Sequence, residues 1–320
     1  MNFAAPSPEL QPLPGADTPA YLCPPDLLLR ARRLGTLPVA VAGAGAAHVL
    51  QSLAWAVGFG LVAPILVGDP KAIAANLPGE LAGARVIAAG DEADAAAKAV
   101  ALVKSGEASL LMKGHVHTDT LLRAALAPGI GLRTGSRLSH VFAMYWAGRS
   151  KPLLITDAAL NVAPDARTFA AIIRHALLTA RALGISHPRI AMLSATEEAS
   201  QAVPSSLAAA EFASTFRDEA LAQGAYISGP MALDVAVSAT AAEIKGLKAD
   251  PVAGHADILA VPNIETGNAL FKMLVHVVNA TAAGIVLGAA APIVLTSRAD
   301  PAEARLASVA LARLVAAEHG

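Results

Sequence analysis

Basic and hydroxyl side chains directly follow a predicted strand at three places in the sequence. The first segment runs from Lys113 to Arg123 and includes His115, His117 and Thr118. The start of a helix offers free N–H groups, and nearby cations favour anions further. We therefore expect the segment to bind a phosphate-like group. A capping residue followed by a solvated arginine would explain the same pattern.

The second segment, residues 131–140, carries Arg133 and Arg137 among glycines and hydroxyl side chains and leads into the next apolar run. Two guanidinium groups in such a loop favour binding of a phosphate or carboxylate, because each presents several donors in a fixed fork. The alternative for either arginine alone is a solvated loop position.

The third segment separates an apolar run ending at Leu295 from the last helix and contains Ser297, Arg298 and Asp300. Open α/β sheets bind ligands beyond the carboxyl ends of their strands. This position predicts a functional role for Ser297 and Arg298. Asp300 and Glu303 are the nearest acids, but a helix cap and a capping box explain them as well.

A fourth polar group follows the apolar run that ends at Val261. Asn263, Glu265 and Asn268 lie at the start of a helix whose apolar residues repeat on one face. Helix capping explains one of these three residues, so we expect the others to contact a ligand.

Two weaker motifs each have a structural alternative. Gly43-Ala44-Gly45 resembles the opening of a dinucleotide fingerprint, but its third small position is His48, and a tight turn between strand and helix explains the glycines. His115 and His117 are two residues apart, yet no third histidine lies near them in sequence, so no metal site is expected.

Short apolar runs alternate with longer segments of helical period, a pattern typical of parallel sheets with crossover helices. The predicted strands are too many for one ordinary sheet, so we expect two α/β domains with mostly parallel sheets. The predicted strands are residues 38–41, 63–67, 86–89, 109–112, 141–146, 153–155, 190–193, 258–261, 284–287 and 293–295. The predicted helices include residues 92–104, 120–127, 166–183, 211–222, 267–278 and 301–317.

Composition narrows the classes of function. The 320 residues are 55% hydrophobic and carry 24 basic and 25 acidic side chains, so neither nucleic acid nor a membrane is an expected partner. The longest apolar run, residues 53–68, is shorter than a spanning helix and contains Gly58, Gly60 and Pro64. A single cysteine, Cys23, excludes an internal disulfide and fits a reducing, cytoplasmic location.

The polar segments, taken in order, resemble the phosphate acetyltransferase and phosphate butyryltransferase family, with the butyryltransferase branch the better match. They also resemble the transferase module that some members fuse to an enoyl-CoA hydratase domain. The likeness extends from about residue 37 onward. Its motifs are LMKGHVHT (111–118), LRA (122–124), GLRTGSRLSH (131–140), GPMALD (229–234), PNIETGN (262–268) and LTSRAD (295–300).

The resemblance implies reversible transfer of an acetyl or short acyl group between CoA and inorganic phosphate, in an enzyme that is commonly a dimer. It implies two domains of the isocitrate and isopropylmalate dehydrogenase type with an active-site cleft between them. The first domain would comprise residues 1–138 and 287–320, and the second residues 139–286. Coenzyme A would be a substrate, and no cofactor or metal is expected.

Site residues follow from the same resemblance. Ser297 and Arg298 would line the active site, and Arg123 would hold phosphate. We expect Arg137 to bind phosphate as well, with Arg133 as the alternative candidate. The other residues expected to bind phosphate or CoA are Lys113, His117, Thr118, Asn263, Glu265 and Asn268. Phosphate acetyltransferases place a basic aspartate seven residues after the serine, but that position is Ala304 here. The base would then be Asp300 or Glu303.

Two other functions share this sequence pattern. A dehydrogenase of the same fold would need NAD and a metal, but the fingerprint lacks its third small position and no carboxylate cluster is evident. A two-lobed binding protein would hold acyl-CoA or another small molecule without turnover. Nicotinamide reduction would identify the first alternative, and binding without release of thiol would identify the second.

Overall fold

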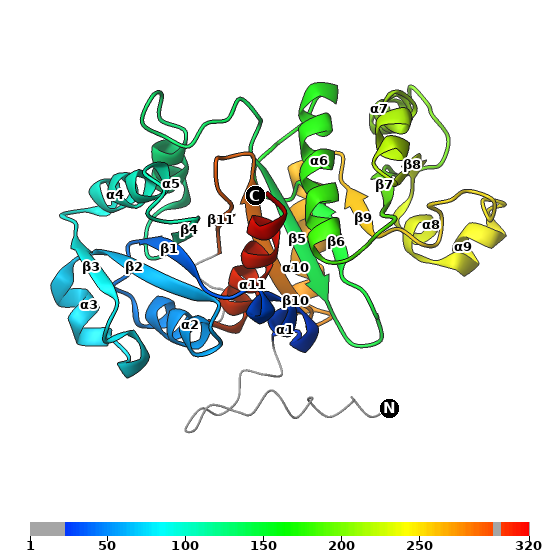
Figure 1. Cartoon of the computed structure of the whole chain (residues 1–320). Coiled ribbons are helices and arrows are strands. Elements are labelled where there is room, and N and C mark those ends of the chain that lie inside the picture. The colour runs from blue at the N-terminus through cyan, green and yellow to red at the C-terminus, as the bar shows by residue number, and fades with distance from the viewer. Residues whose placement is uncertain (1–22, 297–301, 320) are drawn as a thin grey trace. The chain divides into compact units, whose positions relative to one another are not determined.

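The computed structural model describes residues 23–296 and 302–319 (Figure 1). The chain forms two compact units: unit 1 comprises Met1–Leu132 with Ile293–Ala317, and unit 2 comprises Arg133–Pro292 with the last three residues. Both combine helices with a sheet, which confirms the predicted α/β class. The predicted domain division at 138/139 and 286/287 stays a prediction.

Unit 1 contains a parallel sheet in the order β3-β2-β1-β4-β11. The chain leaves β1 toward β2 and β3 and later returns to the other side of β1 with β4. Such a reversal of strand order creates a crevice at the carboxyl ends of the strands. The strands are β1 (Leu37–Ala42), β2 (Val62–Gly68), β3 (Arg85–Ala88), β4 (Leu110–Lys113) and β11 (Ile293–Val294).

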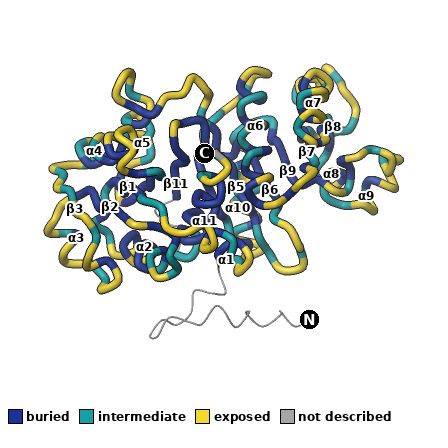
Figure 2. Tube along the Cα trace, viewed as in Figure 1, coloured by how far each residue is buried: buried dark blue, intermediate teal, exposed yellow. Residues whose placement is uncertain are grey.

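Burial within this sheet follows its order. The side chains of β4 are all buried, whereas β3, at the edge, is mostly exposed (Figure 2). Central parallel strands are covered on both faces and so have continuous apolar sequences. Because β4 is fully buried and ends at Lys113, the position of Lys113 at the carboxyl edge of the sheet is fixed.

Short loops join these strands to helices that begin at the same edge. Asp69 caps α3 and Asp91 caps α4 through side-chain bonds to backbone N–H groups, as expected of aspartate at a helix start. Helices α4 and α5 lie side by side in Figure 1. The unit 1 helices are α1 (Pro25–Arg33), α2 (Ala47–Gly58), α3 (Pro70–Asn76), η2 (Gly79–Leu81), α4 (Glu92–Lys104), α5 (Thr118–Ala125) and α11 (Ala302–His319).

The last helix, α11, is buried from Arg305 to Val315, although it contains two arginines in that stretch. Arg313 donates to the backbone oxygens of Leu34 and Gly35 before β1, and Arg305 donates to Thr296 Oγ1 after β11. Buried cations are tolerated when such acceptors satisfy them. Helix α11 thus holds both the segment before β1 and the residue that follows β11 in place.

Unit 2 has a mixed sheet in the order β10-β5-β6-β9-β7-β8. β5 pairs antiparallel with β10 and β6, and the remaining pairs are parallel. The strands are β5 (Ser139–Tyr145), β6 (Leu153–Thr156), β7 (Arg189–Leu193), β8 (Tyr226–Met231), β9 (Ile258–Ala260) and β10 (Thr281–Leu287).

Helices pack on this sheet through apolar stripes. In α6, Ile172, Ile173, Ala176 and Leu177 are all fully buried and repeat at helical spacing. Asp165 caps the start of α6 by accepting from Thr168 N. The unit 2 helices are α6 (Ala166–Ala182), α7 (Pro204–Ala222), α8 (Leu233–Val237), α9 (Ala239–Ile244) and α10 (Ile264–His276).

Candidate functional site

The loops after β1 and β4 are locked together at the point where the strand order reverses. Gly114 N donates to Ala42 O over 2.8 Å, and His115 N donates to Gly43 O over 2.7 Å. A Cβ on Gly114 would lie 2.3 Å from Gly43 O, so only glycine fits. Gly43 has a φ of +74° and packs on Val116, which confirms the tight-turn interpretation of this glycine.

Lys113 ends β4 with a buried side chain that is 2% exposed. Its Nζ donates to Val116 O over 3.2 Å and to Gly114 O over 3.5 Å. A buried ammonium group needs such acceptors, because removing it from water is costly. Lys113 therefore shapes the backbone of its own loop while it holds a positive charge at the strand end.

Glu92, at the start of α4, holds the beginning of α5. Its Oε2 accepts from His117 N over 2.9 Å and lies 2.7 Å from His117 Nδ1. The carboxylate therefore takes a free N–H group that an anion at this helix start would otherwise use. Thr118 begins α5, and Arg123 is exposed on the same helix. Arg123 is the cation that α5 leaves open to a ligand.

A group of basic side chains gathers at the ends of β1, β4 and β11. The pKa of His48, in the first turn of α2, is lowered first by partial desolvation and then by the positive charges of Arg305, His115 and Lys113. The rings of His48 and His115 lie 6.4 Å apart between centroids. Mutual repulsion of cations is relieved by a bound anion, so this group favours a phosphate at the same edge.

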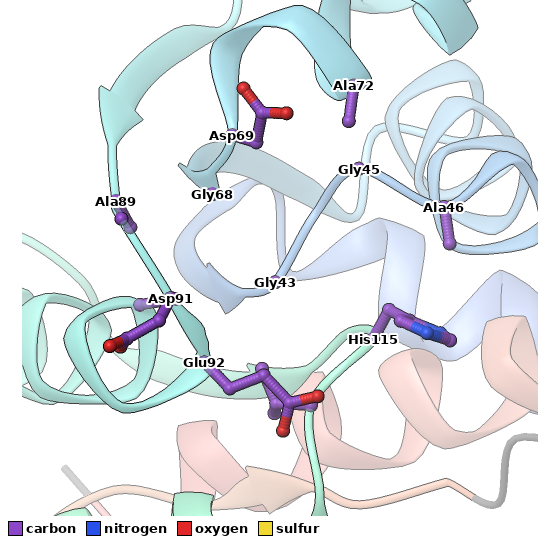
Figure 3. A pocket seen from close by; sticks show the side chains of 13 residues that line it. Gly43, Gly45, Ala46, Gly68, Asp69, Ala72, Ala89, Asp91, Glu92 and His115 are labelled. Carbon is purple, nitrogen blue, oxygen red and sulfur yellow. The ribbon is translucent and has the colours of Figure 1, made fainter.

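A cavity of about 320 Å³ opens beside these loops in unit 1 (Figure 3). Small residues form most of its wall, and Figure 3 shows Asp69, Asp91 and Glu92 reaching it from two other loops. Carboxylates repel a dianion, so this part of the edge suits a neutral portion of a ligand. The lining residues are Gly43, Gly45, Ala46, Gly68, Asp69, Ala72, Ala89, Gly90, Asp91, Glu92, Ala95, His115 and Val116.

Residues 133–140 of unit 2 form a second basic segment, which we call the arginine loop. Arg133 and Arg137 are exposed. Among the residues that the structure describes, neither these two guanidinium groups nor that of Arg123 forms an ion pair with a carboxylate. The pKa of Asp165 is lowered first by its bonds to Thr168 and further by the positive charge of Arg137. That charge places Arg137 near the start of α6.

The base of the arginine loop is fixed by a buried carboxylate that the sequence analysis did not single out. Asp157, after β6, accepts from His140 N over 3.1 Å and from Asn161 Nδ2 over 2.6 Å. Asn161 Nδ2 also donates to Leu138 O over 2.9 Å. The signal for this contact is a single aspartate directly after an apolar strand.

The group at the start of α10 divides in the structure. Asn263 caps the helix, because its Oδ1 accepts from Thr266 N over 2.9 Å. Glu265 is exposed and Asn268 is half-buried. Capping thus accounts for Asn263, and ligand contact by Glu265 and Asn268 stays a prediction.

The third segment follows Thr296, whose side chain is held by Arg305 of α11. Ser297, Arg298 and Asp300 lie outside the described residues. Glu303 is half-buried in the first turn of α11. Unit 1 thus brings Lys113, His117, Thr118 and Arg123 together along one segment and also contains Glu303, whereas Arg133, Arg137, Asn263, Glu265 and Asn268 belong to unit 2.

The described residues contain neither a metal-ligand cluster nor a membrane-spanning helix. Within residues 23–296 and 302–319, no three His, Cys, Asp or Glu side chains are grouped so as to hold a metal ion. No helix in the same ranges is both long and apolar enough to cross a bilayer.

Comparison with known proteins identifies a family. The family model described as phosphate acetyl/butaryl transferase matches residues 86–313. A phosphate acetyltransferase from Rhizobium meliloti is 45% identical over 81% of this chain and 83% of its own length. A phosphate butyryltransferase from Clostridium acetobutylicum is 38% identical over 91% of this chain and 97% of its own.

A solved structure agrees with these relatives. The branched-chain phosphotransacylase from Enterococcus faecalis V583 superposes with a TM-score of 0.78 at 36% identity. The match covers 87% of this chain and 99% of that chain. The likeness therefore extends over both units as well as over the sequence motifs.

Proposed function

The chain belongs to the phosphate acetyl/butaryl transferase family and is a phosphate acyltransferase, and from this premise we propose how it works. It transfers an acetyl or short acyl group reversibly between CoA and inorganic phosphate, directly within a ternary complex. The observation that carries the proposal is that Arg123, Arg133 and Arg137 are exposed and form no ion pair with a carboxylate of the described residues. Guanidinium groups of this kind can bind a dianion without a metal.

Arginines hold the phosphate in this proposal. Arg123, Arg137 and Arg298 are the principal candidates, and Arg133 is the reserve. A charge-assisted hydrogen bond contributes roughly 1.5–3 kcal/mol, so two or three such residues are enough to bind phosphate. The exposed guanidinium groups of Arg123, Arg133 and Arg137 fit this role, because none of them forms an ion pair with a carboxylate of the described residues.

Lys113, His117 and Thr118 have a different role. Lys113 and His117 are bonded within the protein, to Val116 O and Glu92 respectively, and so they fix the loop rather than grip the ligand alone. Their positions set the start of α5, where Thr118 presents its hydroxyl. The Nε2 atom of His117 and the charge of Lys113 remain able to stabilise phosphate at the strand edge.

The chemical step exchanges one bond at the acyl carbon. A phosphate oxygen attacks the thioester carbonyl, the C–O bond forms, and the C–S bond breaks to release the CoA thiolate, which takes up a proton. Ser297 donates to the sulfur or carbonyl oxygen as charge develops, beside Arg298. In the reverse direction a thiol with a reference pKa of ~8.5 benefits from a base, and we assign Asp300 or Glu303.

CoA is bound partly by the start of α10. Glu265 and Asn268 offer an acceptor and an amide there, while Asn263 keeps the helix start in place by capping it. CoA is a substrate in this scheme, and no cofactor is required. We also propose that the enzyme is a cytoplasmic homodimer, which sedimentation velocity and cell fractionation would test.

Release of free thiol tests the proposed reaction. Acetyl-CoA or butyryl-CoA is incubated with the protein, with and without phosphate, and the thiol is measured across acyl chain lengths. Thiol release that depends on phosphate supports the proposal. Binding of acyl-CoA without release would instead identify a binding protein, and reduction of NAD by hydroxy acids would identify a dehydrogenase. Activity should persist in EDTA.

Arg298→Ala tests the assignment of the third segment. We expect turnover to fall by about 100-fold, the upper range for one charge-assisted contact, with the unfolding midpoint unchanged. Arg298→Lys should recover little, because lysine lacks the guanidinium fork. Wild-type kinetics in a folded Arg298→Ala protein would remove Arg298 from the site.

A further inference from the structure

One histidine of helix α6 contacts the arginine loop on both sides of Arg137. The Nδ1 atom of His175 lies 2.7 Å from Ser139 Oγ, and its Nε2 atom lies 3.3 Å from Ser136 Oγ. Both ring nitrogens of one rigid side chain therefore fix the residues that flank Arg137. A serine hydroxyl both donates and accepts, so the two contacts persist in either neutral tautomer.

The end of β10 supports the loop from another side. Thr134 Oγ1 donates to Gly288 O over 2.7 Å, and residues 133 and 289 form an isolated β-bridge. A Cβ on Gly288 would lie 2.2 Å from Arg137 O and 2.9 Å from His175 Cε1. Gly288 therefore packs closely against both the Arg137 carbonyl group and the His175 ring.

Different residues hold different parts of the arginine loop. Asp157 and Asn161 hold its base at His140 and Leu138, where the chain enters β5. His175 holds the part around Arg137, and it does so from a helix in which Ile172, Ala176 and Thr179 are buried. The Arg137 side chain is exposed, so only its backbone is anchored.

We propose that His175 is a positioning residue for phosphate binding, a role that rests on the proposed function of Arg137. The two serine contacts preset the Arg137 backbone so that the guanidinium group meets phosphate without reordering the loop. A displacement of ~1 Å at a substrate-holding group can cost on the order of 100-fold in rate. Loss of the His175 ring should therefore weaken phosphate binding while leaving acyl-CoA binding in place.

Three substitutions separate the contacts. His175→Ala removes both. His175→Asn places an amide nitrogen near the Nδ1 position and so retains the contact with Ser139, whereas His175→Gln places one near Nε2 and retains the contact with Ser136. The matched control is Arg181→Ala on the same helix, where Arg181 Nη2 donates to Gln223 Oε1 over 3.1 Å and contacts no residue of the arginine loop in the described ranges.

The kinetic test measures KM for phosphate and for acyl-CoA in each variant. For His175→Ala we expect KM for phosphate to rise by about 10-fold or more, with KM for acyl-CoA within about twofold of the wild type. His175→Asn should recover most of the loss, because the shorter 2.7 Å contact is the one it keeps. Arg181→Ala should match the wild type. Equal changes in both KM values, or no change in either, would overturn the proposal.

Limited proteolysis tests the same contacts without any assay of activity. Trypsin cleaves after arginine, so cutting after Arg133 and Arg137, identified by mass spectrometry, reports opening of the loop. We expect faster cleavage there in His175→Ala than in the wild type and in Arg181→Ala, at an unchanged unfolding midpoint. If the loop is protected equally in all three, His175 does not position it. If the wild type lacks phosphate-dependent thiol release, the proposed function fails whatever the proteolysis shows.

Discussion

The β4–α5 segment of unit 1 and the arginine loop of unit 2 both present cations, but they hold them in opposite ways. At the end of β4 the cation itself is buried, and Lys113 Nζ donates to the carbonyls of its own loop, whereas Arg123 at the other end of the segment is exposed. In unit 2 the cation is exposed, and the backbone beneath Arg137 is held by other residues. The charged group of Lys113 therefore also stabilises the fold, whereas the charged group of Arg137 is available to bind the ligand.

This difference predicts how substitutions separate stability from activity. Changes at Lys113 and Gly114, at the end of β4, should lower both, because the same atoms build the fold and the site. Changes to the exposed arginines should lower activity alone. Four predictions test this contrast, beginning with the largest expected effect.

Gly114→Ala should have the largest effect, because the new Cβ would lie 2.3 Å from Gly43 O and 2.7 Å from Ala42 O. Neither backbone atom can move without breaking the junction of β1 and β4. We expect the free energy of unfolding to fall by about 3 kcal/mol or more, measured by urea titration.

Gly83→Ala is the matched control in the same unit, because its Cβ would meet no atom within 4 Å. Its free energy of unfolding should change by no more than about 0.5 kcal/mol. Equal stability of the two variants would show that the close approach of the two loops is not required.

Lys113→Met should lower stability and activity together. Methionine keeps the bulk of the side chain but leaves Val116 O and Gly114 O without the ammonium donor. An unsatisfied buried acceptor costs about 1–3 kcal/mol. We expect a lower urea midpoint and a loss of kcat/KM for phosphate by thiol release. A stable but inactive Lys113→Met protein would mean that the lysine acts on the ligand alone.

Arg137→Met should lower activity without lowering stability. The side chain is exposed and has no carboxylate partner among the described residues, so its removal costs the fold little. Loss of a charge-assisted contact of roughly 1.5–3 kcal/mol corresponds to a fall of about 10- to 150-fold in kcat/KM for phosphate. A lower urea midpoint that matches Lys113→Met would remove the contrast between the two regions.

Much of the fold could be predicted from the sequence, because apolar runs of strand length indicate buried strands. Ten of the eleven strands in the described residues were predicted within a few residues, and so was α4, from Glu92 to Lys104. The strand that was missed, β8, contains Gly229-Pro230, which argues against a central strand. β8 is at the edge of its sheet, where the absence of a proline N–H is tolerated.

The charged candidates for ligand binding were predicted from the sequence, but the residues whose contacts hold their loops in position were not. Arg133 and Arg137 stand out because cations in a glycine-rich loop are unusual. His175 and Glu92 do not, because their contacts join positions 36 and 25 residues apart. No periodicity or local spacing encodes such pairs. They arise only when the strands bring the loops together.

The smallest effect is expected at Cys23, which lies in neither region. Its thiol is 1% exposed, and burial raises its pKa from 9.0 to about 12, so the folded protein keeps it protonated at neutral pH. A thiol nucleophile needs the opposite shift. The raised pKa stabilises the fold below pH 9.0, and this contribution is lost as the pH rises toward 12.

Cys23→Ala should therefore keep kcat near the wild-type value, and initial-rate plots should intersect, as direct transfer in a ternary complex requires. The native thiol should react with an aromatic disulfide reagent only after unfolding. Parallel initial-rate plots, together with an acyl-enzyme isolated without phosphate, would contradict direct transfer, and survival of that acyl-enzyme in Cys23→Ala would direct the search to Ser297.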